Sequence, residues 1–321
     1  GGSFRTRQDL DLICTGEQEA IISGSFRSIN KSSKNSIERE VTLRLRTDQP
    51  KEIRVDGSNI VDRGEIVGSI PCILFSHNDL GAIEGPPSQL RRFFDQTAAL
   101  SDPTSLPAQR RYRRILHERN ALLRNGPSED LLEVYDQQLI ETGLLITQQR
   151  TELVADYADR FTDLFRSVAD SDEEVSISYR PSWSNGSISD VARQIKSARQ
   201  RDYAFTTTTT GPHRDRFPLS INGFPFRKYA STGQKRLASL ALRAAQAARV
   251  AELSLSAPIL LLDDVLLELD ARRRERFLQS LPKSDQCFFT FLPDERFDRY
   301  NLGPTLCLKV HAGEIEPWSP D

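Results

Sequence analysis

The sequence has 321 residues, which is long enough for two domains or for one large domain with an insertion. Its 38% hydrophobic and 27% charged residues are ordinary for a globular protein. No apolar stretch approaches the roughly 18 residues that span a bilayer. The opening GGSFRTRQDL lacks the apolar core of a secretory signal. We therefore expect a cytoplasmic protein with no membrane partner.

The cysteine and methionine contents narrow the classes further. Cys14, Cys72, Cys287 and Cys307 are far apart, and none belongs to a C-x-x-C pair. This disfavours a zinc ribbon or a disulfide framework, so buried free thiols are expected. The sequence contains no methionine, and Gly1 is therefore not expected to be a native start.

One segment is strongly basic although the net charge is −2. Between Arg91 and Arg124 lie eight arginines and only three acidic residues, a distribution that favours phosphate contacts. The alternative is a general arginine bias, because the chain uses 35 Arg and 8 Lys. Interleaved Phe93, Phe94 and Tyr112 have helical spacing and are expected to face the core. The candidate DNA-binding residues are Arg110, Arg111, Arg113 and Arg114.

The first quarter of the chain is predicted to be mostly β. Period-two or β-branched runs cover Ala20–Phe26, Val41–Leu45 and Ile53–Val55, and Asp56-Gly57 predicts a hairpin turn. Residues 71–75, PCILF, predict a short buried strand.

The pattern is helical from about residue 87 to residue 169. Apolar residues recur at three and four spacing over Arg91–Leu100, Leu106–Leu123 and Leu131–Ala169, with a break at 125–127. Long helices joined by a short turn predict an antiparallel helical arm. The absence of a sustained heptad excludes an extended coiled coil.

The remaining elements alternate. Asp190–Gln200 predicts a helix, and alternating helix and strand patterns from Ser231 onward predict parallel βα units. Strand character is indicated for Val175–Tyr179, the β-branched run Phe205–Thr210 and Phe217–Ile221, with a loop at Trp183–Ser189 and a turn at Asn222-Gly223.

Two adjacent carboxylates end an apolar strand in the last third of the sequence. Ile259–Leu262 is followed at once by Asp263 and Asp264. Chemistry in an open parallel sheet gathers at the carboxyl ends of the strands, where two charges are costly without a metal or a strong partner. Nucleotide hydrolases place their Walker B pair here, with one carboxylate orienting Mg²⁺ and a second polarising the attacking water. The alternative is an ordinary strand end whose Asp caps the next helix.

A second anion-binding feature is predicted at the start of a helix. Residues 230–246, ASTGQKRLASLALRAAQ, place Ser231 and Thr232 as N-cap candidates before a strong helix-forming run. A hydroxyl, free backbone N–H groups and the positive end of the helix dipole would together face an anion. Taken alone, this start is equally consistent with an ordinary cap.

Taken together, these two segments resemble the signature helix and Walker B strand of ABC-type ATPases, and more closely those of the RecF family of bacterial DNA-repair proteins. The likeness covers essentially the whole chain. Further motifs in family order are SFRTR at 3–7, FSHNDL at 75–80, GPPSQLRRFFD at 85–95, RRYRRILHERNALL at 110–123 and GPHRD at 211–215. The resemblance implies an α/β ABC-type ATPase head, with a mixed, P-loop NTPase-like sheet and an inserted α-helical arm. The head would comprise 1–80 and 200–321, and the helical lobe 81–199.

The resemblance also implies roles for residues on the two sides of a nucleotide. Asp263 would hold Mg²⁺ through water, and Asp264 would stand where many ABC ATPases have the catalytic Glu. Ser231, Gly233 and Gln234 would contact the γ-phosphate of ATP bound by the opposite subunit, so that ATP joins two heads.

Two loops match the family less closely. Glu268 and Asp270 would belong to the D-loop, where Leu267 replaces the family's Ser. His77 and Asn78 depart from the usual Pro-Glu and are assigned only a Q-loop-like role.

The implied function is that of an ATP-dependent DNA-repair protein. ATP and Mg²⁺ are its implied cofactors in the intact protein, which would dimerise on ATP, bind double-stranded DNA near single-strand gaps and help to load recombinase. The implied partners are double-stranded DNA and its single-strand/double-strand junctions, RecR, and indirectly RecO and RecA.

The sequence contains no G-x-x-x-x-G-K-[ST] loop, and its nearest approach is GSFRSINKS at 24–32. In the RecF family this loop precedes SFR, so an N-terminal segment that carries it is expected to be absent here. Without the phosphate cradle, the chain as written is expected not to hydrolyse ATP.

Rival interpretations fit less well. A non-catalytic DNA- or partner-binding module stays open because half the nucleotide site is missing. A transporter subunit is disfavoured by Asp264 in place of Glu, and an SMC-type head would need longer coiled coils. His117-Glu118 lacks the second His of H-E-x-x-H, and His213 is expected to lie in a hydrogen-bonded turn.

Overall fold

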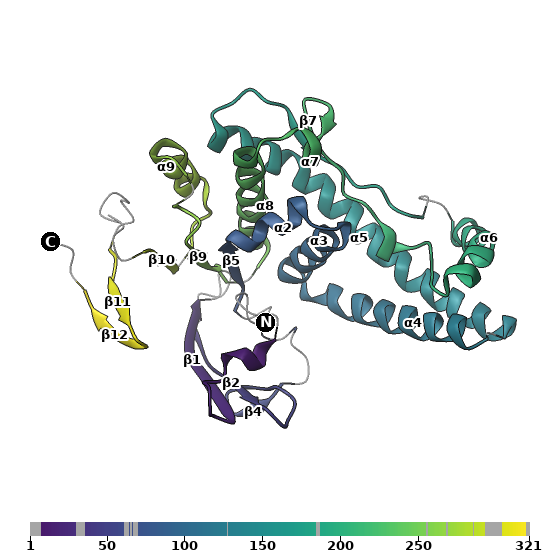
Figure 1. The fold of residues 1–321 in the computed structure, drawn as a ribbon, viewed down its shortest axis with the longest axis horizontal. Helices are drawn as coiled ribbons and strands as arrows, with labels where there is room; N and C mark the ends of the chain where they lie inside the picture. Colours follow the sequence, from purple (N-terminus) through teal and green to yellow (C-terminus); the bar gives the residue numbers. More distant parts are fainter. Residues whose placement is uncertain are drawn as a thin grey trace.

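The computed structural model describes residues 8–318 apart from 30–35, 61–63, 65, 67–69, 127, 184–186, 255, 268, 285 and 293–303. Figure 1 shows a central body, a helical arm on its right and two β units below and to its left. The α-helices of the described chain are α2 (Leu80–Glu84), α3 (Pro87–Ser101), α4 (Leu106–Asn125), α5 (Glu129–Ala169), α6 (Ile188–Phe205), α7 (Phe226–Tyr229), α8 (Thr232–Leu253) and α9 (Ala271–Ser280). Its short 3-10 helices are η1 (Asp9–Leu12), η2 (His77–Asp79), η3 (Pro103–Ser105) and η4 (Pro212–Arg214).

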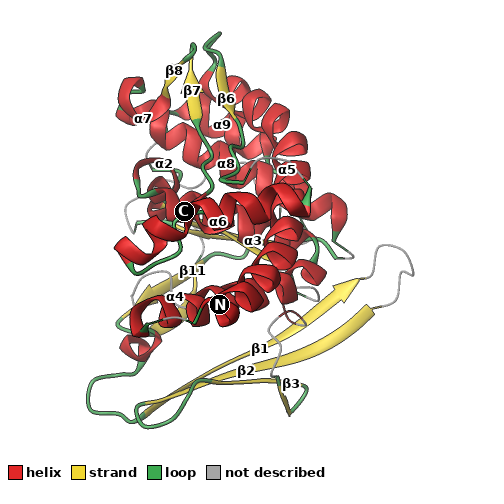
Figure 2. Cartoon of the chain, turned by 90° about the vertical axis from the view of Figure 1, so that its right-hand side faces the viewer, coloured by secondary structure: helices red, strands yellow, loops and turns green. Residues whose placement is uncertain are grey.

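An antiparallel sheet forms the N-terminal unit. Its order is β1-β2-β3-β4, with strands β1 (Glu19–Ile29), β2 (Ser36–Arg46), β3 (Glu52–Val55) and β4 (Ser58–Asn59). β1 and β2 form the long ribbon of Figure 2. Asp56 and Gly57 connect β3 to β4 with φ values of 51° and 77°, which confirms the predicted hairpin turn.

A three-stranded parallel sheet packs against α8 in the body. Its order is β10-β9-β5, from β5 (Cys72–Ser76), β9 (Ile259–Asp263) and β10 (Cys287–Thr290). The predicted parallel βα units of the last third are therefore confirmed. The other small sheets are β6-β7-β8, from β6 (Val175–Ile177), β7 (Leu219–Ile221) and β8 (Phe224–Pro225), and the hairpin β11-β12, from β11 (Leu308–His311) and β12 (Glu314–Pro317).

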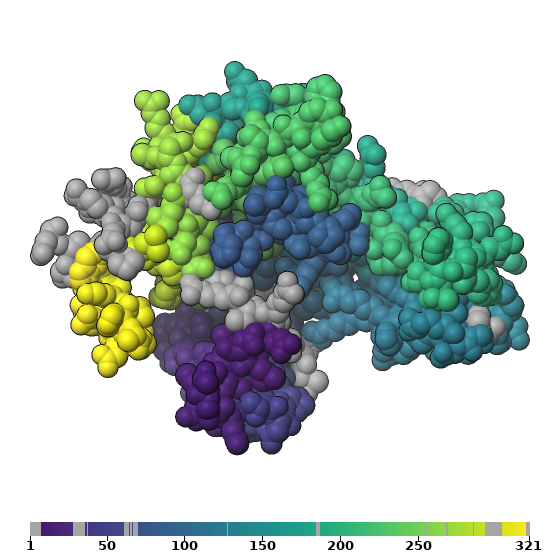
Figure 3. Space-filling view, viewed as in Figure 1, coloured from purple at the N-terminus to yellow at the C-terminus, as the bar shows by residue number. Residues whose placement is uncertain are grey.

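The helical arm consists of α4, α5 and α6, and it projects to the right in Figures 1 and 3. α4 ends at Asn125 and is capped by Gly126, whose φ of 83° is left-handed, and α5 begins at Glu129 after this break. The 41 residues of α5 would extend about 60 Å at 1.5 Å per residue. One end of α5 packs in the arm and the other against α8 and α9, so a single helix joins the arm to the body.

Two groups of buried side chains correspond to these two regions. The larger one joins the parallel sheet to α3, α5 and α8 and contains Phe93 and Phe94. The smaller one lies in the arm around Tyr112 and Trp183. The prediction that these aromatics face the core is confirmed. The proposed division at 80/81 and 199/200 stays a prediction.

The β-branched run Phe205–Thr210 does not form a strand, so that prediction was wrong. α6 continues through Phe205, and Thr206 follows with a left-handed φ of 49°. The Thr209 N–H and hydroxyl both donate to Asp202 Oδ1, at 2.8 and 2.6 Å, and the Thr208 N–H donates to Asn120 Oδ1 at 2.8 Å. Side-chain acceptors on α6 and α4 thus satisfy the groups that a neighbouring strand would have satisfied.

The cysteines are free, as expected, but they are not buried. Cys14, Cys72 and Cys287 are exposed and Cys307 is half-buried. Cys72 and Cys287 begin β5 and β10, the outer strands of the three-stranded sheet, where apolar sequence neighbours do not ensure burial.

Candidate nucleotide site

Three strand ends meet at one edge of the parallel sheet. In the register of the sheet, Asp263 at the end of β9 lies beside Ser76 of β5 and Thr290 of β10. Asp263 is 7% exposed, and Asp264 follows it at the rim. The prediction that both carboxylates lie at the carboxyl end of a buried parallel strand is therefore confirmed.

The Thr290 hydroxyl connects the two carboxylate residues. It donates to Asp263 Oδ1 at 2.9 Å and accepts from the Asp264 backbone N–H at 3.1 Å. It also lies 3.3 Å from Asp264 Oδ1. Asp264 itself has a φ of 56°, a left-handed conformation that Asp tolerates better than most residues. One side chain from β10 thus fixes both the buried acid and the turn after it.

The loop after β5 is tied to α8. Asp79 accepts from the Ser76 backbone N–H at 2.9 Å through Oδ2 and from Arg243 Nε at 2.8 Å through Oδ1. Arg243 also lies over the Phe93 ring, 5.1 Å from its centroid. His77 and Asn78 are exposed within this anchored turn, one residue beyond the strand end that pairs with Asp263. These two residues are thus adjacent to the acidic pair, while their Q-loop-like role stays a prediction.

A cavity of about 240 Å³ lies between this turn, α8 and the segment after β9. Ser76 and His77 line it from one side, Arg236 and Ser239 from α8, and Val265 from the segment that follows Asp264. Leu80, Leu240 and Leu269 complete the lining, so the wall is largely apolar and carries a few hydroxyl, imidazole and guanidinium groups, a mixture typical of small-ligand cavities.

The start of α8 has the cap that the sequence predicts. Ser231 is the N-cap: its Oγ accepts from the Gln234 N–H at 3.2 Å, and its N–H donates to Gln234 Oε1 at 2.6 Å. Gln234 Nε2 also donates to Glu173 Oε1 at 2.5 Å. Gly233 is exposed, and a Cβ there would have no atom within 4 Å. Thr232 is the first helical residue and not the cap.

The start of α8 lies apart from the cavity that the middle of the helix borders. Ser231 lies five residues before Arg236, which corresponds to roughly 8 Å along the helix axis away from the cavity. Ser231 thus belongs to the helix that borders the cavity but does not itself line the cavity. Its assignment to the nucleotide of another subunit stays a prediction.

The D-loop prediction is only partly described. Glu268 lies outside the described residues. Asp270 is the N-cap of α9, where its Oδ1 accepts from the Arg273 N–H at 3.0 Å. This backbone hydrogen bond, followed by nearby arginine charge, lowers the pKa of Asp270 below its ordinary value. In the structure Asp270 therefore serves first as a helix cap.

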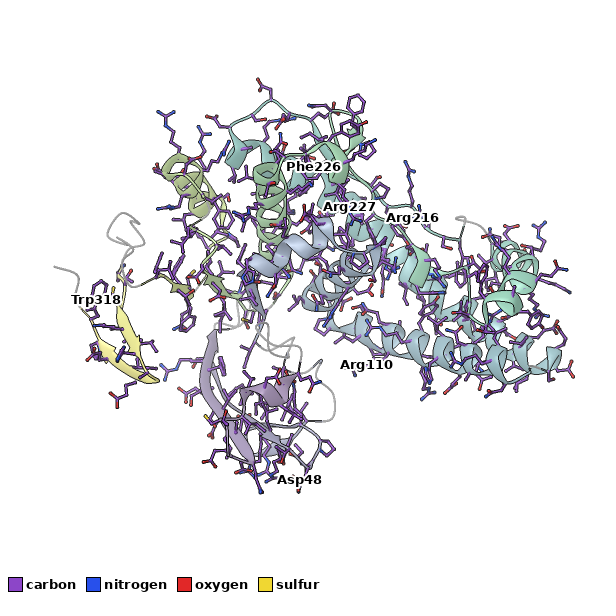
Figure 4. All side chains as sticks on the ribbon, viewed as in Figure 1. Asp48, Arg110, Arg216, Phe226, Arg227 and Trp318 are labelled. Atoms are coloured by element: carbon purple, nitrogen blue, oxygen red, sulfur yellow. The ribbon has the colours of Figure 1, made fainter. Side chains whose placement is uncertain are left out.

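The four candidate DNA-binding arginines lie on one turn and a half of α4, and all are exposed. Two have acidic neighbours at the margin of ion-pair distance: Arg113 is 3.7 Å from Asp95, and Arg114 is 3.7 Å from Glu118. Their side chains remain 64% and 77% exposed, so solvent screening leaves these pairs weak. Figure 4 shows Arg110 at the lower edge of the arm.

Arg119, which contributed to the basic count of this segment, is fully buried and cannot contact DNA. Its Nε donates to Asp136 Oδ1 and its Nη1 to Asp202 Oδ2, both at 2.7 Å. The eight-arginine count therefore overstated the surface charge, because one guanidinium neutralises acids inside the arm.

Comparison with known proteins decides the family. No protein-family model matches the chain. The DNA replication and repair protein RecF of Treponema pallidum is 35% identical over 323 residues, covering 98% of this chain and 87% of that protein. The chain belongs to the RecF family. RecF of Lachnoclostridium phytofermentans is likewise 32% identical over 318 residues, covering 98% of this chain and 86% of its own length.

Solved structures agree with this assignment. The chain matches the recombination mediator protein RecF-ATPrS in the RecFOR pathway with a TM-score of 0.84 at 26% identity, covering 99% of this chain and 85% of that one. An SMC head bound to the winged-helix domain of ScpA matches at a TM-score of 0.52 and 14% identity, which supports the fold alone. The predicted ABC-type ATPase head is confirmed.

Several residues around this candidate site could not be assigned from the sequence. Asp79, Arg236 and Arg243 lie within the quoted segments FSHNDL and ASTGQKRLASLALRAAQ but had no predicted role, whereas Thr290 of β10 lies in no quoted motif. Within the described chain, no helix is long and apolar enough to cross a bilayer, and no three His, Cys, Asp or Glu residues are grouped as metal ligands.

Proposed function

We propose that this chain is the head and arm of a cytoplasmic DNA repair, recombination and replication protein, which dimerises on ATP and Mg²⁺ to hold DNA. The observation that carries the proposal is the joining of Asp263, Asp264 and Thr290 at one sheet edge, next to the segment that lines a small cavity. The solved RecF-ATP structure supports ATP as the ligand, with a TM-score of 0.86 and 26% identity.

The residues present fit the acidic half of a magnesium-nucleotide site. Mg²⁺ is commonly held by one or two carboxylates together with phosphate oxygens and water, so a cage of three protein ligands is not required. Asp263 would hold the metal's water shell from the buried strand end. Bound Mg²⁺ would neutralise phosphate charge, while Asp264 at the rim would orient the attacking water.

The signature residues would act across a dimer. Ser231, Gly233 and Gln234 stand at the exposed start of α8, where a hydroxyl and free N–H groups favour an anion. To contact a γ-phosphate, the Ser231 hydroxyl and the Gln234 amide would exchange their mutual hydrogen bonds for bonds to the nucleotide. A second head would bind the nucleotide that carries this phosphate. Each nucleotide site would therefore be complete only in the dimer.

The basic face of α4 would contact double-stranded DNA. Arg110, Arg111, Arg113 and Arg114 offer four exposed charges without any base-specific geometry, which suits binding to a phosphate backbone. RecR, and indirectly RecO and RecA, are the proposed protein partners, and single-strand/double-strand junctions the preferred DNA, on the basis of family membership.

Sedimentation of the full-length protein with and without ATP and Mg²⁺ tests the proposal. We expect a nucleotide-dependent dimer that Ser231→Arg abolishes. Ser187→Arg is the matched control, because Ser187 caps α6 with the same capping box and lies outside the proposed interface. Equal dimerisation of the wild type and Ser231→Arg would instead favour a non-catalytic DNA- or partner-binding module.

A further inference from the structure

A second basic surface lies in the arm, apart from the α4 arginines. A cleft of about 650 Å³ opens where the end of α6 meets the segment around η4. Arg180, Arg214 and Arg216 line it, and no carboxylate is among its lining residues. All three arginines are exposed. In Figure 4, Arg216 and Arg110 lie on opposite sides of the arm helices.

The backbone holds two of these arginines side by side. Arg180 and Arg216 form an antiparallel bridge, with N–H to O distances of 2.8 and 3.0 Å. Residues directly opposite in an antiparallel pair project their side chains to the same face. Arg214 is anchored separately, because its Nη2 donates to the Thr208 carbonyl at 3.1 Å. The charges are therefore gathered before any ligand arrives.

The acid between them does not cancel this charge. Asp215 is fully buried, and its carboxylate accepts from Arg150 Nη1 at 2.6 Å and from the Ser182 N–H at 2.8 Å. Its negative charge is thus compensated inside the arm. The C-terminal end of α6 adds only about half a negative charge at the cleft, which three guanidinium groups exceed.

An aromatic ring completes the cleft. Phe205, the last residue of α6, is 68% exposed and lines the same space. A single exposed Phe is unremarkable by itself. Beside three arginines it provides what sites for unpaired nucleotides combine, namely a flat apolar face for a base and cations for the flanking phosphates. A duplex would not use this ring, because its base faces are already stacked on one another.

We propose that this cleft binds an unpaired stretch of a DNA strand, with a base stacked on Phe205 and phosphates on Arg180 and Arg216. The site deepens the proposed function, on which it rests, by separating single-strand contacts here from duplex contacts on α4. The hydroxyls of Thr207 and Thr209, which also line the cleft, provide further polar groups for sugar or phosphate oxygens.

Fluorescence anisotropy of the full chain with labelled oligothymidylate, and with a blunt-ended hairpin duplex, tests this inference. We expect Phe205→Ala to weaken single-strand binding roughly tenfold and Arg180→Ala/Arg216→Ala to weaken it at least about tenfold. Duplex affinity should change by less than about twofold in either case, because α4 supplies those contacts. Circular dichroism would verify that the variants fold.

An exposed phenylalanine and an exposed arginine outside the cleft provide matched controls. Phe224→Ala removes another ring, 55% exposed on β8, and Arg193→Ala removes an exposed arginine from α6. Both should leave single-strand affinity unchanged. The inference is overturned if Phe205→Ala has no effect, since an anion site without stacking would remain, or if single-strand and duplex affinities fall equally. Failure of ATP-dependent dimerisation would appear in the Ser231→Arg comparison and would not alter these affinity ratios.

Discussion

The Thr290 hydroxyl lies 2.9 Å from Asp263 Oδ1 and also accepts the backbone N–H of Asp264 at 3.1 Å. β10 therefore holds in place the two acids that β9 carries to the sheet edge. A residue 26 positions away from Asp264 decides how these carboxylates are presented.

We expect Thr290→Val to lower ATP turnover in the full-length protein by roughly tenfold or more, because one positioning hydrogen bond is lost and a buried carboxylate loses a donor. Thr290→Ser keeps the hydroxyl and should restore most activity. Turnover should be followed by phosphate release over a range of Mg²⁺ concentrations. Equal turnover in the wild type and the Val variant would show that the hydroxyl does not position the acids.

Replacing Arg110, Arg111, Arg113 and Arg114 with Ala should flatten the salt dependence of duplex binding. Each phosphate contact contributes a slope of about 0.9 in log affinity against log salt, so the loss could reach about 3 to 4. Removal of four exposed arginines elsewhere, Arg27, Arg193, Arg272 and Arg273, gives the same change in net charge. An unchanged slope in the α4 variant would remove this helix from the interface.

Arg150 connects α5 to α3 and to the segment around η4 deep in the arm. It donates to Asp95 Oδ1 at 2.8 Å and to Asp215 Oδ2 at 2.6 Å. Its side chain is only 6% exposed. Arg150→Met removes the buried cation that both acids share, leaving Asp95 only its weak contact with Arg113, and should cost about 3–5 kcal/mol in free energy of unfolding. Urea titration provides the measurement. Arg193→Met, at an exposed position, should change it by less than about 0.5 kcal/mol.

Gly143 lies where α5 passes the buried ring of Trp183. A Cβ at this position would come within 2.4 Å of Trp183 Cζ3. Gly143→Ala should therefore destabilise the arm by about 1–3 kcal/mol through overpacking. Gly233→Ala is the control, because a Cβ there meets nothing within 4 Å. Thermal unfolding that shifts equally in both variants would contradict the close approach.

His213 should make stability fall in mild acid. Burial lowers its pKa to about 4, outweighing the hydrogen bond to the Thr208 carbonyl, and Arg214 and Arg91 lower it further while Asp202 opposes them. Between pH 6.5 and 4, His213 is protonated in the unfolded chain but stays neutral in the folded chain. The free energy of unfolding should thus be fully retained above 6.5 and fall by up to roughly 3 kcal/mol as pH drops through this window.

The acid dependence can be assigned with His213→Gln, which cannot take up a proton. Denaturant titrations across the window should show a shallower decline for this variant than for the wild type. Tyr112, whose hydroxyl lies 2.8 Å from His213 Nδ1, remains neutral throughout this range because burial raises its pKa. Parallel curves for the two proteins would mean that His213 titrates normally.

The sequence by itself determined the elements whose signals are local. The helices from Pro87 to Ala169, the Asp56-Gly57 turn, the Ser231 cap and the acids at the end of β9 follow from periodicity, turn chemistry and capping, which act over a few residues. The RecF motifs added the family and the head fold. The strand predicted at Phe205–Thr210 was wrong because local patterns do not show which partners the backbone will find. The side chains of Asp202 and Asn120 accept the N–H groups of Thr209 and Thr208 that a neighbouring strand would otherwise bind.

Only the tertiary structure decided which distant side chains meet. It brought Thr290 to Asp263, buried Arg119 between two acids, exposed the cysteines on outer strands and set Phe205 beside Arg180 and Arg216. These outcomes depend on strand order, register and burial, which arise from long-range packing. Local sequence patterns show which chemical groups are present. Long-range packing determines which groups meet and how far each is exposed to solvent, and these two properties decide what each group can do.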